Sequence, residues 1–538
     1  MPRTQRARPA AARSGLLRSS ALISAGVLVS RATGFARTVV LVSVLGTTAL
    51  ADAYNFANNV PNIVYELVAG GVLAAVLLPL FVDLLQRRDR DGTSAVVSVA
   101  VTGLAALTVL GLLTAPALGW AIAAFRGGEQ QAEQQQALTV LLRWFMPQVF
   151  FYGVMTVVTS LLQARRRFGA AAFAPAVNNL VTIAAYLLAP VISGVDLGTA
   201  GLGTAIADRW TFTVLGLGTT LGVVANAALL LPALRNERLG LRFRPTLRHP
   251  AIRRLGSASR GALGFVAVSQ VGVIVTSLLA NRYSDAGGYA AYTYASLFFY
   301  VAYGLLAVSI TTALAPELAS AAQEGDMARL RREWLRGLRL IVLLMAPASA
   351  GLVVLAWPLM RSLPLTAEGA ELTAGILAWF ATGLVAFSVY QYVVRSFYAL
   401  SDTTTPFRLA MLQNSFIIGA AVVLAPTFGL LGLAASFVLG FWVVAVAGFS
   451  RFAHRIGRVP ASRVAVLPRI VGASLAMAAT SGAVVSLLEW GDRAPPAPAA
   501  AAAGLLAAAV AYPAYLWALR ADGDLRALAA VLGRMVGR

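Results

Sequence analysis

The sequence contains no cysteine and no lysine, and its only histidines, His249 and His454, both lie in arginine-rich segments. Without cysteine the chain has no disulfides and no thiolate metal sites. Two histidines so far apart offer no histidine cluster for catalysis or for a metal. Charged residues make up only 12% of the chain, which is about half their share in a soluble protein. These absences exclude an ordinary soluble enzyme.

Long apolar runs are what the sequence has in abundance. Hydrophobic residues make up 59% of its 538 residues, and the mean hydropathy is +0.75. The runs recur from residue 20 to residue 519, and they reach the roughly 20 residues that a helix needs to cross a bilayer. They are continuously apolar and not alternating, so they predict helices and not barrel strands. The sequence therefore predicts an all-α polytopic membrane protein.

Fourteen transmembrane helices are predicted, with short polar breaks between them. Their ranges are 20–46, 56–85, 94–123, 137–162, 170–194, 211–234, 261–282, 288–321, 340–361, 371–398, 406–426, 429–450, 465–488 and 497–519. Residues 196–210 are polar and rich in glycine, so we expect a loop there. Only a short turn at 426–429 separates the eleventh helix from the twelfth.

Arginine is distributed as the positive-inside rule expects if both termini are cytoplasmic. The segments that then face the cytoplasm carry most of the 43 basic residues. The opposite loops hold only Arg126, Arg209, Arg282, Arg361 and Arg493. The net charge of +21 is spread over all cytoplasmic segments and not gathered on one domain. We therefore attribute this charge to the orientation of the chain in the membrane and to attraction to anionic lipids, and we expect no nucleic-acid partner.

Two arginines, Arg31 and Arg37, lie deep inside the first predicted helix. An arginine at the centre of a membrane helix costs about 2.5–3.5 kcal/mol on insertion scales. One interpretation is a buried ion pair between one of them and Glu66, the only comparably deep acid. The other is a water-filled cationic cavity that receives an anionic substrate, because deep ionisable groups usually mark a transport path. The two interpretations are compatible, since one acid cannot neutralise two arginines.

Four segments, in order, resemble the MurJ/MviN family of lipid II flippases. The first is "LVSRATGFARTVVLVSVLG" (28–46), which continues into "ADAYNFANNVPNIVYELVAGGVLAAVLLPLFVDLL" (51–85). The others are "QARRRFGAAAFAPAVNNLVTI" (163–183), "GLLAVSITTALAPELASAAQEGD" (304–326) and "RSFYALSDTTTPF" (395–407). The resemblance implies the multidrug/oligosaccharidyl-lipid/polysaccharide exporter fold, in which two six-helix bundles form a V around a central cavity and two C-terminal helices follow.

On this resemblance the chain divides into two bundles with basic segments around them. The expected parts are a basic cytoplasmic tail (1–19), an N-terminal six-helix bundle (20–234), a basic cytoplasmic linker (235–260), a C-terminal six-helix bundle (261–450), the last two helices (465–519) and a basic cytoplasmic tail (520–538).

The family's substrate is a polyprenyl chain joined through a pyrophosphate to a disaccharide-peptide, which a flippase moves across the cytoplasmic membrane by alternating access. The resemblance implies this function for the chain, with the cell-wall synthesis machinery as a further partner. It implies no enzymatic activity. We expect no cofactor, because no nucleotide-binding loop is visible in the sequence. We expect the membrane potential or an ion gradient to drive transport.

Candidate substrate-binding residues follow from the matching motifs. Arg31 and Arg37 match the two arginines of the family's first helix, and the planar guanidinium suits phosphate oxygens. The expected supporting or gating residues are Asp52, Pro61, Asn62, Glu66, Asn178, Asn179 and Gln270. Asp52 is alternatively an ordinary polar residue at the outer surface, and Pro61 with Asn62 a structural kink. The asparagines and Gln270 either line the cavity or join helices by hydrogen bonds.

The chain also departs from the family pattern. Thr38 follows the second arginine where many members carry an acid, and Ser296 and Leu297 stand where the family has an Asp-Arg pair. These departures leave open a flippase for another polyprenyl-pyrophosphate-linked glycan. An ion-coupled drug antiporter of the same fold is a further alternative, but the deep charges are positive. A membrane enzyme would need an acidic pair, and Asp89 with Asp91 is better interpreted as a solvated turn.

Overall fold

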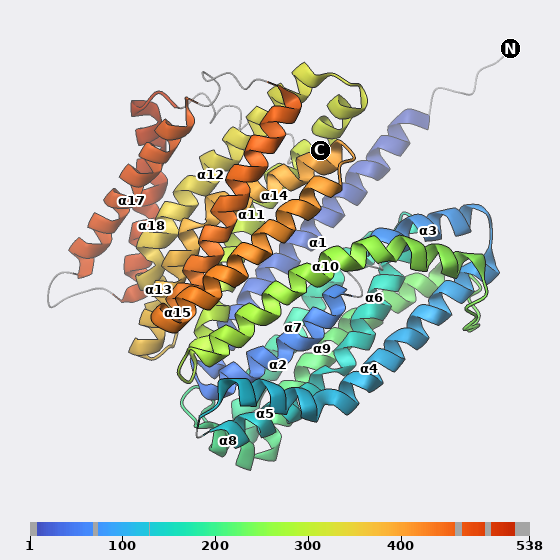
Figure 1. Cartoon of the computed structure of the whole chain (residues 1–538), viewed down its shortest axis with the longest axis horizontal. Helices are drawn as coiled ribbons and strands as arrows, with labels where there is room; N and C mark the ends of the chain where they lie inside the picture. The colour runs from blue at the N-terminus through green and yellow to red at the C-terminus, as the bar shows by residue number, and fades with distance from the viewer. Residues whose placement is uncertain (1–7, 68–73, 129, 458–464, 490–495, 522–538) are drawn as a thin grey trace. The chain divides into compact units, whose positions relative to one another are not determined.

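Helices form every regular element in the residues that the structure, a computed structural model, describes: 8–67, 74–128, 130–457, 465–489 and 496–521 (Figure 1). The predicted all-α class is thus confirmed. The chain folds as two compact units, which join between Val271 and Gly272. The predicted bundle and tail boundaries stay predictions.

The first unit contains the helices up to α10 and includes α10 as far as Val271. They are α1 (Arg8–Leu45), α2 (Ala49–Tyr65), α3 (Ala74–Gln86), α4 (Arg90–Arg126), α5 (Gln131–Phe145), α6 (Pro147–Ala164), α7 (Gly169–Ser193), α8 (Leu202–Ala207), α9 (Arg209–Asn236) and α10 (Pro250–Arg282). Helix α7 lies between α1 and α9 and packs along both (Figure 1).

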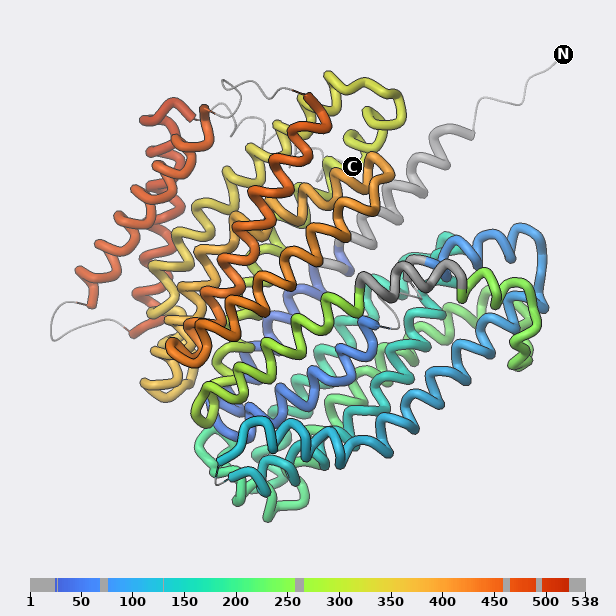
Figure 2. The backbone as a smooth tube through the Cα atoms, in the orientation of Figure 1, coloured from blue at the N-terminus to red at the C-terminus, as the bar shows by residue number. Residues whose placement is uncertain are grey.

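The second unit contains the rest of α10 and the helices that follow. They are α11 (Gly288–Gln323), α12 (Met327–Arg361), α13 (Ala367–Thr382), α14 (Leu384–Ala399), α15 (Thr404–Ile456), α17 (Leu467–Glu489) and α18 (Ala497–Ala518). Helices α17 and α18 lie side by side and pack against α12, as the red end of the tube in Figure 2 shows.

Among the described residues, ten helices are long and apolar enough to cross a membrane, or eleven if α13 and α14, bent by 45°, count as one span. The chain is therefore a multi-pass membrane protein. The predicted number of fourteen is not confirmed, because length and hydropathy alone do not resolve every predicted span. The predicted range 56–85 contains two shorter helices, α2 and α3. The expected loop at 196–210 is partly wrong, since it contains the short helix α8.

Helix α15 consists of two helical segments that meet at a kink at Gly429, where two helices were predicted. Gly429 has φ 55° and ψ −133°, a conformation that glycine adopts without steric penalty. The bend falls at the expected turn between 406–426 and 429–450. The backbone at Gly429 also lies close to Tyr283, because a Cβ on Gly429 would lie 3.3 Å from the Tyr283 carbonyl oxygen.

Polar side chains cap the starts of several helices. The Thr48 hydroxyl accepts a hydrogen bond from the Ala51 amide at the start of α2, and the Asp89 carboxylate accepts one from the Gly92 amide at the start of α4. Such caps satisfy amides that have no partner inside the helix. Asp89 therefore caps a helix, which is a structural role.

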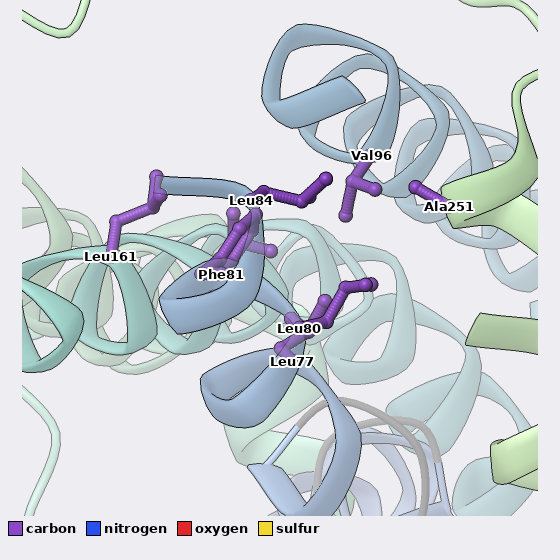
Figure 3. Close-up of a cluster of buried hydrophobic side chains, with 8 residues drawn as sticks. Leu77, Leu80, Phe81, Leu84, Val96, Leu161 and Ala251 are labelled. Atoms are coloured by element: carbon purple, nitrogen blue, oxygen red, sulfur yellow. The ribbon is translucent and has the colours of Figure 1, made fainter. Parts of the chain in front are cut away.

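One apolar cluster joins α3 to α4, α6 and the start of α10. Its buried members are Leu77, Leu80, Phe81, Leu84, Val96, Val157, Leu161 and Ala251. Figure 3 shows this cluster, with Leu84 directed toward Val96. This cluster packs α3 against three other helices of the first unit.

We predict that Phe81→Ala destabilises the first unit. Phe81 is fully buried, and removing a buried phenyl ring costs about 3–5 kcal/mol through lost transfer energy and the cavity left behind. The measurement is the free energy of unfolding of the purified protein in detergent. Phe243→Ala is the control, since Phe243 is 71% exposed. Equal effects of the two substitutions would contradict the packing described.

Candidate functional site

The two arginines of interest lie in α1, within its membrane-compatible segment Leu28–Leu45. Arg31 is exposed and Arg37 is half-buried. At about 100° of helix rotation per residue, a spacing of six places them roughly 120° apart on the helix surface. In the described part of the chain, neither Arg31 nor Arg37 forms an ion pair. The alternative of a salt bridge to Glu66 is therefore not found there; Glu66 is exposed and follows the last residue of α2.

Arg37 acts on three tyrosine hydroxyls of the first unit. Its charge interacts with the phenols of Tyr54, Tyr152 and Tyr186, which we call the tyrosine cluster. The Tyr54 hydroxyl lies 2.7 Å from that of Tyr186 and 2.8 Å from the Thr219 hydroxyl. A cation that acts on these hydroxyls from a distance, and that forms no ion pair with a carboxylate of the described residues, can receive an anion.

The tyrosine cluster was not predicted from the sequence. Its members come from α2, α6 and α7, and a tyrosine in an apolar helix is common. The contacts that join them link residues 132 positions apart in the case of Tyr54 and Tyr186. The sequence indicated only that several tyrosines lie in the middle of apolar helices, where their hydroxyls need hydrogen-bond partners.

Asp52 is buried in the first turn of α2 and pairs with Arg126, at the last turn of α4. The side chain of Asp52 is 1% exposed and that of Arg126 is 17% exposed, and the Asp52 Oδ2 to Arg126 Nη1 distance is 3.3 Å. The alternative of an ordinary surface residue is therefore wrong for Asp52. This ion pair ties the start of α2 to the end of α4.

One of the two asparagines of α7, Asn179, joins α7 to α1. Asn179 is buried, and its amide donates hydrogen bonds to the Ser30 carbonyl and to the Thr33 hydroxyl of α1, both at 3.1 Å. Asn178 accepts a hydrogen bond from the Thr182 hydroxyl within α7. Asn179 thereby fixes α7 to the turn of α1 that carries Arg31, which is a supporting role for the arginine.

The remaining predicted residues are placed individually. Pro61 is buried inside α2, and the Asn62 amide donates a hydrogen bond to the carbonyl of Asn58 one turn earlier. Gln270 is half-buried in α10. The structure thus brings Arg37 to the tyrosine cluster and Asn179 to α1, while Asp52 pairs with Arg126. It does not bring Glu66 to either arginine within the described residues.

The position of the missing Asp-Arg pair lies in α11 of the second unit. The Ser296 hydroxyl donates a hydrogen bond to the Thr293 carbonyl in its own helix. One turn on, Phe299 contacts the rings of Phe380 and Phe387. These residues give this stretch of α11 an aromatic neighbourhood.

Among the described residues, no group of three or more His, Asp or Glu residues is arranged to hold a metal ion.

The family model described as "Lipid II flippase MurJ" matches residues 41–491. The chain is 27% identical to the "Lipid II flippase MurJ" of Burkholderia cenocepacia, over 94% of this chain and 97% of that relative. It is 27% identical to the "Probable lipid II flippase MurJ" of Rhizobium meliloti, over 88% and 87%.

Solved structures share the fold. The structure "Lipid II flippase MurJ, inward closed conformation" superposes with a TM-score of 0.74 at 20% identity, over 93% of this chain and 99% of that one. An inward-facing multidrug resistance MATE family transporter superposes with a TM-score of 0.64 at 16% identity, over 79% and 94%.

Proposed function

The chain belongs to the MurJ lipid II flippase family, and on that premise we propose that it moves lipid II, the lipid-linked peptidoglycan precursor, from the inner to the outer leaflet of the cytoplasmic membrane. The chain is then a transporter and not an enzyme. Its substrate carries a pyrophosphate and peptide carboxylates, so the group that must cross the membrane is strongly anionic.

The observation that supports this proposal is that α1 has two arginines without an ion pair among the described residues. Arg37 is half-buried and its charge acts on the tyrosine cluster, and Arg31 is exposed on the same membrane-compatible helix. A cation in that position has an energetic penalty that an anionic ligand offsets. Arginine suits a pyrophosphate because its fork donates two parallel hydrogen bonds and remains charged.

Transport proceeds by alternating access, in which the site opens to one side of the membrane at a time. Both termini lie in the cytoplasm, as the distribution of arginine favours. The membrane potential, negative inside, favours outward movement of an anion by about 2.3 kcal/mol per charge per 100 mV. Coupling to this potential or to an ion gradient supplies the driving force.

One observation favours a second candidate function. Where the family's Asp-Arg pair is expected, the chain has Ser296 and Leu297 close to the aromatic side chains around Phe299. Replacing a charged pair by uncharged residues changes which head group binds well. The alternative is therefore a flippase for another polyprenyl-pyrophosphate-linked glycan. The MATE-family likeness supports the fold alone.

The test is complementation in cells depleted of their own lipid II flippase. We expect the wild-type chain to restore lipid II at the outer face, measured by its accessibility to an external probe. Protein amount in the membrane is measured in parallel. If the chain is present and folded but lipid II stays inside, lipid II is the wrong cargo and the second candidate is favoured.

A further inference from the structure

A pocket of about 300 Å³ opens inside the first unit, next to the tyrosine cluster. Its polar lining consists of Tyr65, Thr156, Thr159, Ser160, Gln163 and Asn226, and small or apolar side chains of α6, α7 and α9 complete it. Among the described residues, no charged side chain lines it. Its volume lies at the lower end of the range for ligand pockets, so it has room for one sugar-sized group and not for a whole lipid-linked head group.

The lining has hydrogen-bonding capacity that the protein does not use. Asn226 is 3% exposed, and its Oδ1 atom accepts no hydrogen bond within the described residues. Buried side-chain amides nearly always have a partner. Thr159 also forms no side-chain hydrogen bond in the described part of the chain. An uncharged ligand rich in hydroxyl and amide groups suits this wall, in which the Thr159 hydroxyl has no partner among the described residues.

The pocket adjoins the tyrosine cluster. The ring of Tyr65, at the pocket wall, lies 4.9 Å from the ring of Tyr152 between centroids. The charge of Arg37 acts on Tyr152 in turn. Tyr65 and Tyr152 therefore link the pocket to the tyrosine cluster, on which the charge of Arg37 acts.

We propose that this pocket holds the sugar bonded directly to the pyrophosphate of the transported lipid, with the side chains of Thr159 and Asn226 as hydrogen-bonding groups of its wall. The pyrophosphate and this sugar are neighbours in the substrate, and the pocket adjoins the tyrosine cluster on which the charge of Arg37 acts. Because no charged side chain among the described residues lines it, the pocket suits an uncharged sugar better than a phosphate or a peptide carboxylate. This assignment rests on the proposed function, because it needs a lipid-linked sugar as the cargo.

The test compares two ligands on the purified full-length protein by native mass spectrometry. One is lipid II, and the other is the same polyprenyl pyrophosphate without its sugars. Asn226→Leu removes the unsatisfied amide at similar volume, and Thr159→Val removes a half-exposed hydroxyl with little risk to folding. The matched control is Thr108→Val, because the Thr108 hydroxyl is also buried without a partner in the described residues but does not line the pocket.

We expect Asn226→Leu and Thr159→Val to weaken lipid II binding by about three- to tenfold, the effect of one neutral hydrogen bond. Binding of the sugar-free lipid stays unchanged in both variants, and Thr108→Val changes neither ligand. If both ligands weaken equally, or if neither weakens, the pocket does not hold the sugar. If the wild type binds neither ligand, the proposed function itself fails, which the wild-type measurement shows on its own.

Discussion

Arg37→Ala is expected to reduce lipid II translocation by about a hundredfold. A charge-assisted hydrogen bond contributes about 1.5–3 kcal/mol, and a bidentate contact to a phosphate makes two of them. A loss of about 3 kcal/mol corresponds to about two powers of ten in binding or rate. The measurement is outer-leaflet lipid II in flippase-depleted cells at matched protein amount. Arg37→Lys, which keeps the charge and loses the planar fork, recovers only part of the activity.

Arg143→Ala provides the matched control for Arg37. Arg143 is an exposed arginine in the last turn of α5, inside another membrane-compatible helix. If any arginine removed from these helices lowers activity through folding or insertion, Arg143→Ala lowers it as much as Arg37→Ala does. That result would contradict a specific role for Arg37 in holding the anion.

Asp52→Asn is expected to destabilise the first unit by about 3 kcal/mol. Removing one partner of a buried ion pair costs about 3–5 kcal/mol, and both side chains of this pair are largely buried. The measurement is the free energy of unfolding of the purified protein in detergent. The double variant Asp52→Asn with Arg126→Gln removes both charges and is expected to regain most of the loss.

The control for Asp52 is an exposed ion pair of the same unit. Asp83 contacts Arg87 and Arg254, with a side chain that is 34% exposed. Exposed pairs contribute about 0–1 kcal/mol, so Asp83→Asn is expected to change stability little. If Asp52→Asn is as mild as Asp83→Asn, or if the double variant is no better than the single one, the pair does not hold α2 to α4.

Hydropathy predicted where helices lie but not always where they begin. The predicted ranges 170–194 and 288–321 agree with α7 and α11 to within two residues. For α12 the predicted start at 340 is late, because the helix begins at Met327. Its first three turns carry several arginines, so they are helical without being apolar. An apolar pattern indicates which residues can lie in the membrane. The start of the helix is indicated instead by a capping residue such as Asp326, whose carboxylate accepts a hydrogen bond from the Arg329 amide.

The candidate site was only partly predictable for a related reason. Arg31 and Arg37 stand out because a charge interrupts an apolar run. The partner of Asp52 was not foreseen, since Arg126 is 74 positions away and pairing between distant helices leaves no local pattern. The tyrosine cluster and the pocket beside it were missed because tyrosine, threonine and asparagine are common in membrane helices. These residues form a site only because the fold places them next to one another.

The most direct test of the central claim is translocation of lipid II in proteoliposomes that contain only the purified chain. Wild type and the double variant Arg31→Ala/Arg37→Ala are compared at equal reconstitution, against protein-free vesicles. We predict that the wild type accelerates lipid II movement between leaflets and that the double variant moves it no faster than protein-free vesicles. A wild type that does not exceed protein-free vesicles, or a double variant as fast as the wild type, would contradict the claim that the arginines of α1 hold the anionic group as it crosses.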